Sequence, residues 1–255
     1  GEFHLAVDLG CLKNSAFCVN DLALKDVSVV VDSKQMAPAA EPAPQQESSG
    51  DLSTPYPISL RHLALNNINI KIDDTTVSLL EFSSGVNWQG RSLTLAPTRI
   101  QSLLVALPKA AQVADEQVIQ PKVTEPQPEE KPLGETLQAM FAEPLLPALP
   151  DFQLPLDIDV QQLLGEQLRI TGDTDVAITR LLLKAKTTDR HVQLETFDVD
   201  SPQGQINASG DARLADNWPV NFVLNGSLNL DPIKGEKIKL NLAGAMRDEL
   251  KLGLN

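Results

Sequence analysis

The sequence predicts a mainly β protein, in which an elongated, curled sheet of the antiparallel type surrounds an aliphatic interior and is accompanied by one short helix. Three observations support this prediction. One strand pattern occurs twice, most other segments alternate apolar and polar residues with the period of a β-strand, and only 4% of the residues are aromatic. The apolar content therefore comes mainly from Leu, Val, Ile and Ala, which give a smooth aliphatic interior.

Two passages of the chain share one pattern. Residues 20–32 read NDLALKDVSVVVD, and residues 61–73, which start 41 positions later (61 minus 20), read RHLALNNINIKID. In each copy the apolar residues change parity after a Leu-Ala-Leu triplet, near Asp26 and near Asn67. A change of parity moves side chains to the other face of a strand, so we predict a bulge or tight break at both places. A pattern repeated in this way indicates a repeating β-architecture.

The composition excludes several classes of partner. Of the 255 residues, 21 are basic and 34 acidic, so the formal net charge is −13. Such a charge disfavours nucleic acids and anionic membrane surfaces. The apolar pattern already runs at both ends of the chain, which we interpret as an excerpt of a longer protein.

We expect residues 1–32 to form a β-hairpin tied by a disulfide. Cys11 and Cys18 flank the turn between a strand over residues 3–9 and a strand that starts near Leu22. A bridge between them would stabilise the hairpin by about 2.5 kcal/mol and would indicate an oxidising compartment. The alternative is a pair of unbridged cysteines that act as small apolar residues.

The remaining chain divides by composition. Residues 33–54 and 110–131 are rich in Pro, Glu, Gln, Ala and Ser and are predicted to be flexible linkers. Residues 55–109 form a second β repeat with a hairpin turn at Gln89-Gly90. Residues 132–143 have helical apolar spacing between two prolines and predict a short amphipathic helix. Residues 144–255 read as a β-meander, in which strict alternation from Phe152 to Val160 predicts its first strand.

No catalytic or metal-binding pattern stands out. The three histidines His4, His62 and His191 have no ligand spacing, and no nucleotide-binding or hydrolase motif occurs. Carboxylates that recur at period two are better explained as the solvated face of a sheet than as calcium ligands. We therefore expect a protein that is not an enzyme and that uses no cofactor or metal.

The apolar side of the strands is the candidate functional feature. Two sheets packed about 10 Å apart would fill it with side chains, as in a sandwich, and composition favours this arrangement. A curled trough would instead leave an aliphatic groove open to hydrocarbon chains, and the repeat favours this one. The residues expected to line the groove are Val27, Val29, Val31, Ile68, Ile70, Ile72, Leu154, Leu156, Ile158 and Val160.

Several long strings carry a resemblance to a known family. They are HLAVDLGCLKNSAFCVNDLALKDV, DLSTPYPISLRHLALNNINIKIDDTTV, KPLGETL, GEQLRITGDTD and NASGDARLADNWPVNFVLNGSLNLDPIKGEKIKL. Together they resemble the N-terminal periplasmic part of the TamB family, the inner-membrane subunits of translocation and assembly modules within the AsmA-like, repeating β-groove group.

The resemblance implies a function as well as a fold. Family members carry a single membrane anchor outside these residues, cross the periplasm of Gram-negative bacteria and meet TamA, an outer-membrane barrel, through a distal domain. The implied role is conduction of phospholipid between the two membranes along the groove. The alternative implied role is a chaperone-like one, in which the protein helps β-barrel proteins and autotransporters insert into the outer membrane.

Overall fold

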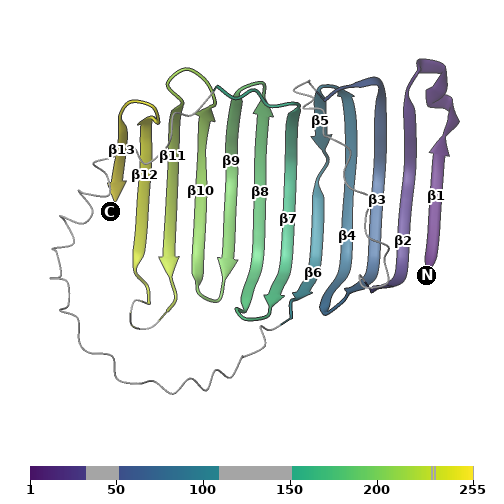
Figure 1. Cartoon of the computed structure of the whole chain (residues 1–255), viewed down its shortest axis with the longest axis horizontal. Coiled ribbons are helices and arrows are strands. Elements are labelled where there is room, and N and C mark those ends of the chain that lie inside the picture. The colour runs from purple at the N-terminus through teal and green to yellow at the C-terminus, as the bar shows by residue number, and fades with distance from the viewer. Residues whose placement is uncertain (33–51, 109–150, 231, 233, 255) are drawn as a thin grey trace, which may run out of the picture. The chain divides into compact units, whose positions relative to one another are not determined.

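The computed structural model describes residues 1–32, 52–108, 151–230, 232 and 234–254. In these residues, thirteen β-strands form one large curled sheet. Figure 1 shows the strands lying side by side. The strands are β1 (Glu2–Asp8), β2 (Phe17–Val31), β3 (Thr54–Ile72), β4 (Thr75–Gly90), β5 (Ser92–Leu95), β6 (Thr98–Ala106), β7 (Asp157–Thr171), β8 (Val176–Thr188), β9 (His191–Ser201), β10 (Gly204–Arg213), β11 (Pro219–Leu228), β12 (Lys237–Ala245) and β13 (Leu250–Leu254). The 3-10 helix η1 (Leu9–Asn14) joins β1 to β2. The predicted mainly β fold is confirmed.

The strands follow chain order across the sheet, except that β5 and β6 occupy one place together. Both pair with β4 on one side and with β7 on the other. Most neighbours are antiparallel, but β2–β3, β5–β7 and β6–β7 are parallel. The sheet is therefore mixed, where the sequence predicted an antiparallel type. Parallel neighbours need long connections, and residues 32–53 and 107–156 are long enough to provide them.

The sequence repeat forms the parallel pair β2–β3. Leu22 pairs with Leu63, Val27 with Ile68, and every other pair in this ladder keeps the same spacing of 41 positions. Equivalent residues of the two copies thus lie side by side and point to the same side of the sheet. Because the two copies pair in register, they place matching apolar residues next to each other on one face of the sheet.

At the predicted break, one residue of each copy takes the left-handed backbone conformation and kinks the strand. Asp26 has φ = 54° and Asn67 has φ = 52°, a conformation that Asp and Asn tolerate better than most residues. The Asn67 amide donates to Asp26 Oδ1 at 2.6 Å. On the next parallel pair, Ser102 (φ = 53°) and Gln167 (φ = 56°) are kinked likewise, and Ser102 Oγ donates to Gln167 Oε1 at 2.6 Å. We call these four residues the kink line.

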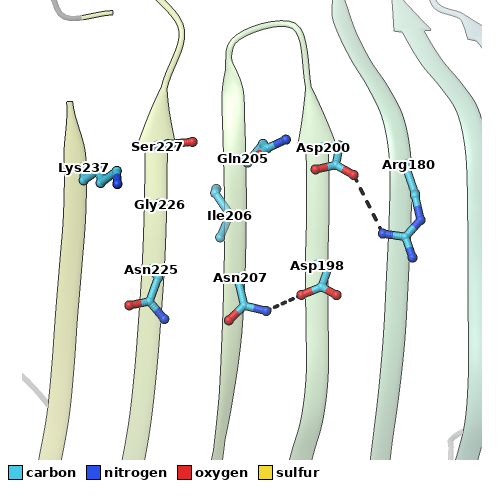
Figure 2. Close-up of a pocket in the computed structure, with 10 residues that line it drawn as sticks. All are labelled: Arg180, Asp198, Asp200, Gln205, Ile206, Asn207, Asn225, Gly226, Ser227 and Lys237. Carbon is cyan, nitrogen blue, oxygen red and sulfur yellow. Dashed lines mark hydrogen bonds and ion pairs between the residues drawn. The ribbon is translucent and has the colours of Figure 1, made fainter. Parts of the chain in front are cut away.

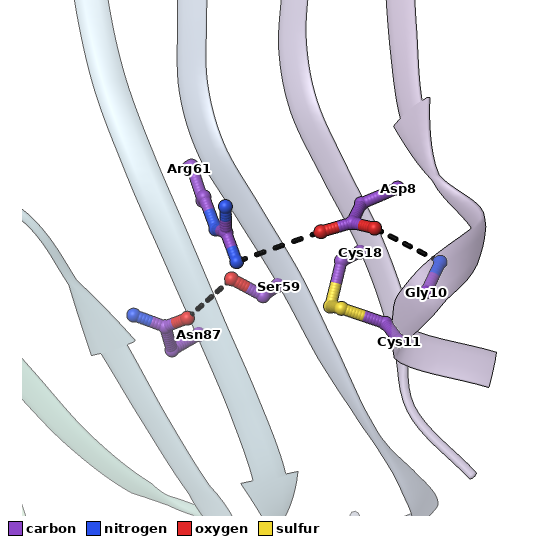
Figure 3. Close-up of polar contacts among 7 residues, drawn as sticks. All are labelled: Asp8, Gly10, Cys11, Cys18, Ser59, Arg61 and Asn87. Atoms are coloured by element: carbon purple, nitrogen blue, oxygen red, sulfur yellow. Dashed lines mark hydrogen bonds and ion pairs between the residues drawn. A yellow bond between two sulfur atoms is a disulfide. The ribbon is translucent and has the colours of Figure 1, made fainter. Parts of the chain in front are cut away.

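The first hairpin contains the disulfide that the sequence predicted. Cys11 and Cys18 are bridged, with their Cα atoms 6.0 Å apart. The helix η1 starts where the Asp8 carboxylate accepts a hydrogen bond from the Gly10 N–H at 2.9 Å, and Arg61 of β3 lies 3.8 Å from the same carboxylate (Figure 3). The strand that follows begins at Phe17, earlier than the expected start near Leu22.

The start of β7 differs from the prediction. The alternation from Phe152 predicted a strand, but β7 begins only at Asp157. Pro155 has no N–H and cannot join a ladder. The N–H of Leu154 donates instead to the Asp189 carbonyl at 3.0 Å, and that of Phe152 donates to the Leu214 carbonyl at 3.0 Å. The predicted helix over residues 132–143 and nearly all of the two predicted linkers lie outside the described residues.

The predicted hairpin turn joins β4 to β5, one residue later than expected: Gln89 pairs with Ser92, so the loop residues are Gly90 and Arg91. Trp88 pairs with Leu93 across the turn after Gly90, whose φ is 57°. Asp216 (φ = 57°) and Gly235 (φ = 89°) lie in the connections that precede β11 and β12. These residues take left-handed conformations that Gly, Asn and Asp accept at low cost.

The described strands form a single layer. In this part of the chain only five apolar side chains are buried, those of Cys18, Ile68, Ala212, Ala215 and Val220, and no large side chain is fully buried. No second sheet packs on the first among these residues, because all thirteen strands belong to one sheet. The sandwich arrangement that composition favoured is therefore not the one adopted.

Candidate functional site: an apolar face across the sheet

Three neighbouring rows of side chains make one face of the sheet apolar. Residues paired in register point to the same side, so each row can be followed from strand to strand. The first row is Val7, Val19, Leu60, Val86, Leu95, Val160, Ala185, Leu194, Gly210, Phe222, Leu242 and Leu252. The second is Leu5, Leu22, Leu63, Ser84, Thr98, Leu163, Leu183, Phe197, Ala208, Leu224, Leu240 and Leu254. The third is Phe3, Leu24, Leu65, Phe82, Ile100, Gly165, Leu181, Val199, Ile206, Gly226 and Ile238.

A fourth row continues the face beyond the kink line. It consists of Val29, Ile70, Val77, Val105, Ile170 and Val176. Leu168, two residues before Ile170, shows that this row and the third row share a side, because a Cβ added to Gly165 would come within 2.9 Å of Leu168 Cδ1. We refer to the four rows together as the apolar face. The kink line shifts the alternation of side chains by one residue. The apolar residues on both sides of it therefore point to the same face of the sheet.

Two polar residues interrupt the second row, and they satisfy each other. Ser84 and Thr98 are 8% and 6% exposed, and their hydroxyl oxygens lie 2.7 Å apart in a hydrogen bond. Thr98 Oγ1 also donates to the Ala96 carbonyl at 3.0 Å. Because their hydrogen bonds are made to each other and to the backbone, these hydroxyls do not require water on the apolar face.

The opposite face is polar and charged. Each residue of its central row is a chain neighbour of a third-row residue: Glu2, Lys25, Asn66, Glu81, Gln101, Glu166, Arg180, Asp200, Gln205, Ser227 and Lys237. Charged members lie close to opposite charges, as in Arg180–Asp200 at 3.8 Å, and Arg99 lies 2.7 Å from Glu166. This strict alternation makes the two faces chemically distinct.

A hollow of about 380 Å³ lies on the charged face, over β8 to β12 (Figure 2). Asp198 and Asp200 lie beside it, and both are already engaged. The Asn207 amide donates to Asp198, and Arg180 pairs with Asp200. Partners within the sheet thus account for these carboxylates, as expected for a solvated sheet face.

The groove residues expected from the sequence fall into three groups. Val27, Val29 and Val31 pair with Ile68, Ile70 and Ile72 near the carboxyl ends of β2 and β3. Ile158 and Val160 pair with Leu93 and Leu95 near the amino end of β7. Leu154 and Leu156 precede β7 and lie in no strand.

The first two groups lie at opposite ends of the strands, that is, along the two opposite margins of the sheet that the strand ends form. The strands β2, β3 and β7 run in the same direction, because β4 is antiparallel to both β3 and β6, and β6 is parallel to β7. On β7, Ile170 is the residue level with Val29 and Ile70, and Leu168 is the residue level with Val27 and Ile68. Sequence reasoning missed both. The parity change around Gln167, like that at Asp26 and Asn67, is the signal that could have found them.

The described residues contain no cluster of three or more His, Cys, Asp or Glu side chains that could hold a metal ion. Among them, too, no helix has the length and apolarity required to cross a membrane.

The single-layer sheet with one continuous apolar face defines the class of β-groove proteins. Comparison with known proteins assigns the family within that class. The chain belongs to the TamB N-terminal domain family, whose family model matches residues 1–255. It is similar to the translocation and assembly module subunit TamB of Haemophilus influenzae, with 25% identity over 273 aligned residues that cover 99% of this chain. The chain spans 20% of that relative's length. No solved structure matches the chain.

Proposed function

We propose that this chain is part of a bridge that conducts phospholipid along the apolar face, between the inner and outer membranes, for outer-membrane biogenesis. The observation that carries the proposal is the continuity of the apolar face. Its first three rows run from β1 to β12 or β13 and its fourth row from β2 to β8, and the polar side chains within them, Ser84 and Thr98, are hydrogen-bonded to each other. Members such as Ile170 and Val176 remain 45% exposed. Acyl chains form no hydrogen bonds, so they gain burial on such a surface without leaving a polar group unsatisfied.

The wider setting of this function is part of the same proposal. The chain acts in the periplasm of a Gram-negative bacterium, as a segment of a single-pass inner-membrane protein whose distal part meets the TamA barrel. Family membership supports this setting. The role is non-catalytic and needs no cofactor, because an apolar surface lowers the cost of moving a hydrocarbon chain without any bond being made or broken.

A second candidate function is assistance in the assembly of β-barrel proteins. The observation that favours it is β1, which forms an edge of the sheet in the described part of the chain. Its residues Phe3 and Leu5 are 65% and 49% exposed. An exposed edge strand can pair with an extended client through main-chain hydrogen bonds. This function depends on the edge, whereas lipid conduction depends on the interior of the face.

A charge placed in the fourth row separates the two functions. Val77 pairs with Ile70 and Val105 in the middle of that row, so Val77→Asp puts a carboxylate in the path of the acyl chains. We expect phospholipid transfer between the membranes to fall by about tenfold or more, the factor set by desolvating a charge. Assembly of barrel proteins through the edge should change little.

The matched control is Ser78→Asp. Ser78 is the next residue of β4, on the opposite face, in register with Asn69. It introduces the same charge on the same strand and should leave transfer unchanged. Equal transfer in wild type and Val77→Asp, measured with radiolabelled phospholipid in cells that produce each variant at the same level, would rule out conduction along this face.

A further inference from the structure

One glycine in the third row leaves space that no other residue fills. Gly226 lies between Ile206 of β10 and Ile238 of β12. A Cβ placed on Gly226 would meet nothing closer than the Gln205 carbonyl oxygen, at 3.5 Å. Its φ is not in the left-handed region, so the backbone does not require glycine here.

The other glycines of the apolar face are explained by packing. A Cβ on Gly210 would lie 2.3 Å from the Asn221 carbonyl oxygen and 2.5 Å from the Phe222 ring. A Cβ on Gly165 would lie 2.9 Å from Leu168 Cδ1. Glycine inside a strand weakens it and often marks a place where a ligand or backbone comes close. Neighbouring protein atoms account for Gly210 and Gly165, but nothing in the sheet accounts for Gly226.

A hollow of about 200 Å³ lies over Gly226. Its apolar walls are Val199, Ile206, Leu224, Leu228 and Ile238, and it is bordered by Ser201, Gln203, Gly204, Gln205 and Ser227. None of these side chains is charged. A cavity of about 150 Å³ lined by aliphatic side chains is large enough to hold benzene, so this hollow has room for several methylene groups.

We propose that the hollow over Gly226 is a binding site for a phospholipid acyl chain, and that Gly226 is the residue that keeps it open. The inference rests on the proposed function and adds a definite site to it. An acyl chain fits better than a peptide strand, because β9, β10 and β11 at the hollow already pair with a neighbouring strand on each side. Their main-chain groups are therefore not available to an incoming strand, whereas an alkyl chain needs none.

The test fills the hollow with a larger side chain at position 226 and maps, by photo-labelling, where an acyl chain binds. The intact protein that contains this chain is incubated with vesicles of phosphatidylethanolamine and phosphatidylglycerol, some of which carry a diazirine near the end of one acyl chain. After illumination, mass spectrometry maps the labelled residues. In the wild type, label is expected on Ile206, Leu224 or Ile238, and also along the fourth row.

Gly226→Leu should lower the label at the hollow by about tenfold, the factor that corresponds to roughly two methylene groups losing burial. The matched control is Asn225→Leu, which adds the same side chain one residue away, on the opposite face of β11, and should label like wild type. Gly226→Ala should give a smaller loss, and it serves as the test if Gly226→Leu lowers the urea midpoint of unfolding.

The outcomes separate the site from the proposed function. Label in the fourth row but not at the hollow, or label at the hollow that Gly226→Leu leaves unchanged, overturns the site alone. Label nowhere on the apolar face overturns conduction together with the site. Displacement of the label by a peptide of alternating apolar and polar residues, with the peptide then cross-linked at Ile206 or Ile238, overturns the acyl-chain assignment in favour of a client strand.

Discussion

Asn67 holds the backbone in a conformation that few side chains accept. Its φ of 52° is stabilised by the 2.6 Å hydrogen bond that its amide donates to Asp26 Oδ1. A β-branched residue at this φ brings its Cβ substituents against the backbone, which costs about 1–2 kcal/mol. The identity of this one side chain therefore helps to keep Leu65 and Ile68 on the same face of β3.

We expect Asn67→Val to lower the free energy of unfolding by about 2–3 kcal/mol, the sum of the conformational cost and the lost hydrogen bond. Urea unfolding followed by circular dichroism measures the change. Asn67→Gly serves as the control, since it loses the hydrogen bond but adopts φ > 0 freely. If both variants were equally destabilised, the kink would not be the cause.

Ser84 and Thr98 provide a second prediction at the residue scale. Replacing one partner leaves the other hydroxyl buried with fewer hydrogen bonds, so Ser84→Ala should cost about 1–2 kcal/mol. Adding Thr98→Val should recover part of that loss, because the second row then becomes wholly apolar. A double-mutant cycle with urea measures the coupling. Additive effects of the two substitutions would mean that the 2.7 Å contact contributes nothing.

At the scale of elements, the disulfide fixes η1 against β2. The bridge closes the short segment between β1 and β2, so its loss enlarges the conformational freedom of the unfolded hairpin. Cys18 is 7% exposed and packs at the start of β2. The effect should therefore be concentrated in β1, which pairs with β2 alone in the described part of the chain.

We expect the variant with both Cys11→Ser and Cys18→Ser to lose about 2.5 kcal/mol, the chain-entropy value for this loop. Hydrogen exchange resolved by mass spectrometry should show faster exchange in β1 and η1, with little change in β8 to β10. Faster exchange throughout the sheet would contradict the local role of the bridge. Reduction of the wild type with dithiothreitol should reproduce the same pattern.

Several features could be predicted from the residue pattern, because they are set by residues that lie close together in the chain. The repeat, the parity change at Asp26 and Asn67, the Cys11–Cys18 bridge and the turn at Gly90 each depend on near neighbours in the chain. The start of β7 was not predictable in this way. Alternation from Phe152 to Val160 satisfied the strand pattern, but Pro155 prevented pairing and the preceding N–H groups found partners in distant turns.

Strand direction and the extent of the apolar face are properties of the whole sheet. Strand periodicity is the same for parallel and antiparallel neighbours, so it could not reveal that β2–β3 and β6–β7 are parallel. Of the predicted groove residues, Val29 and Ile70 share a row, whereas Ile158 and Val160 lie at the other end of the sheet. Only the register between strands shows that Ile170 lies in the same row as Val29 and Ile70.

The central claim for the whole molecule is that acyl chains contact the apolar face. Its most direct test is in-cell cross-linking from a photoreactive amino acid placed at Ile70, with Lys71, the next residue on the opposite face of β3, as the matched position. We predict that mass spectrometry recovers phospholipid bound at position 70 and none at position 71. Recovery of client protein at position 70, or of phospholipid equally from both positions, would contradict the claim.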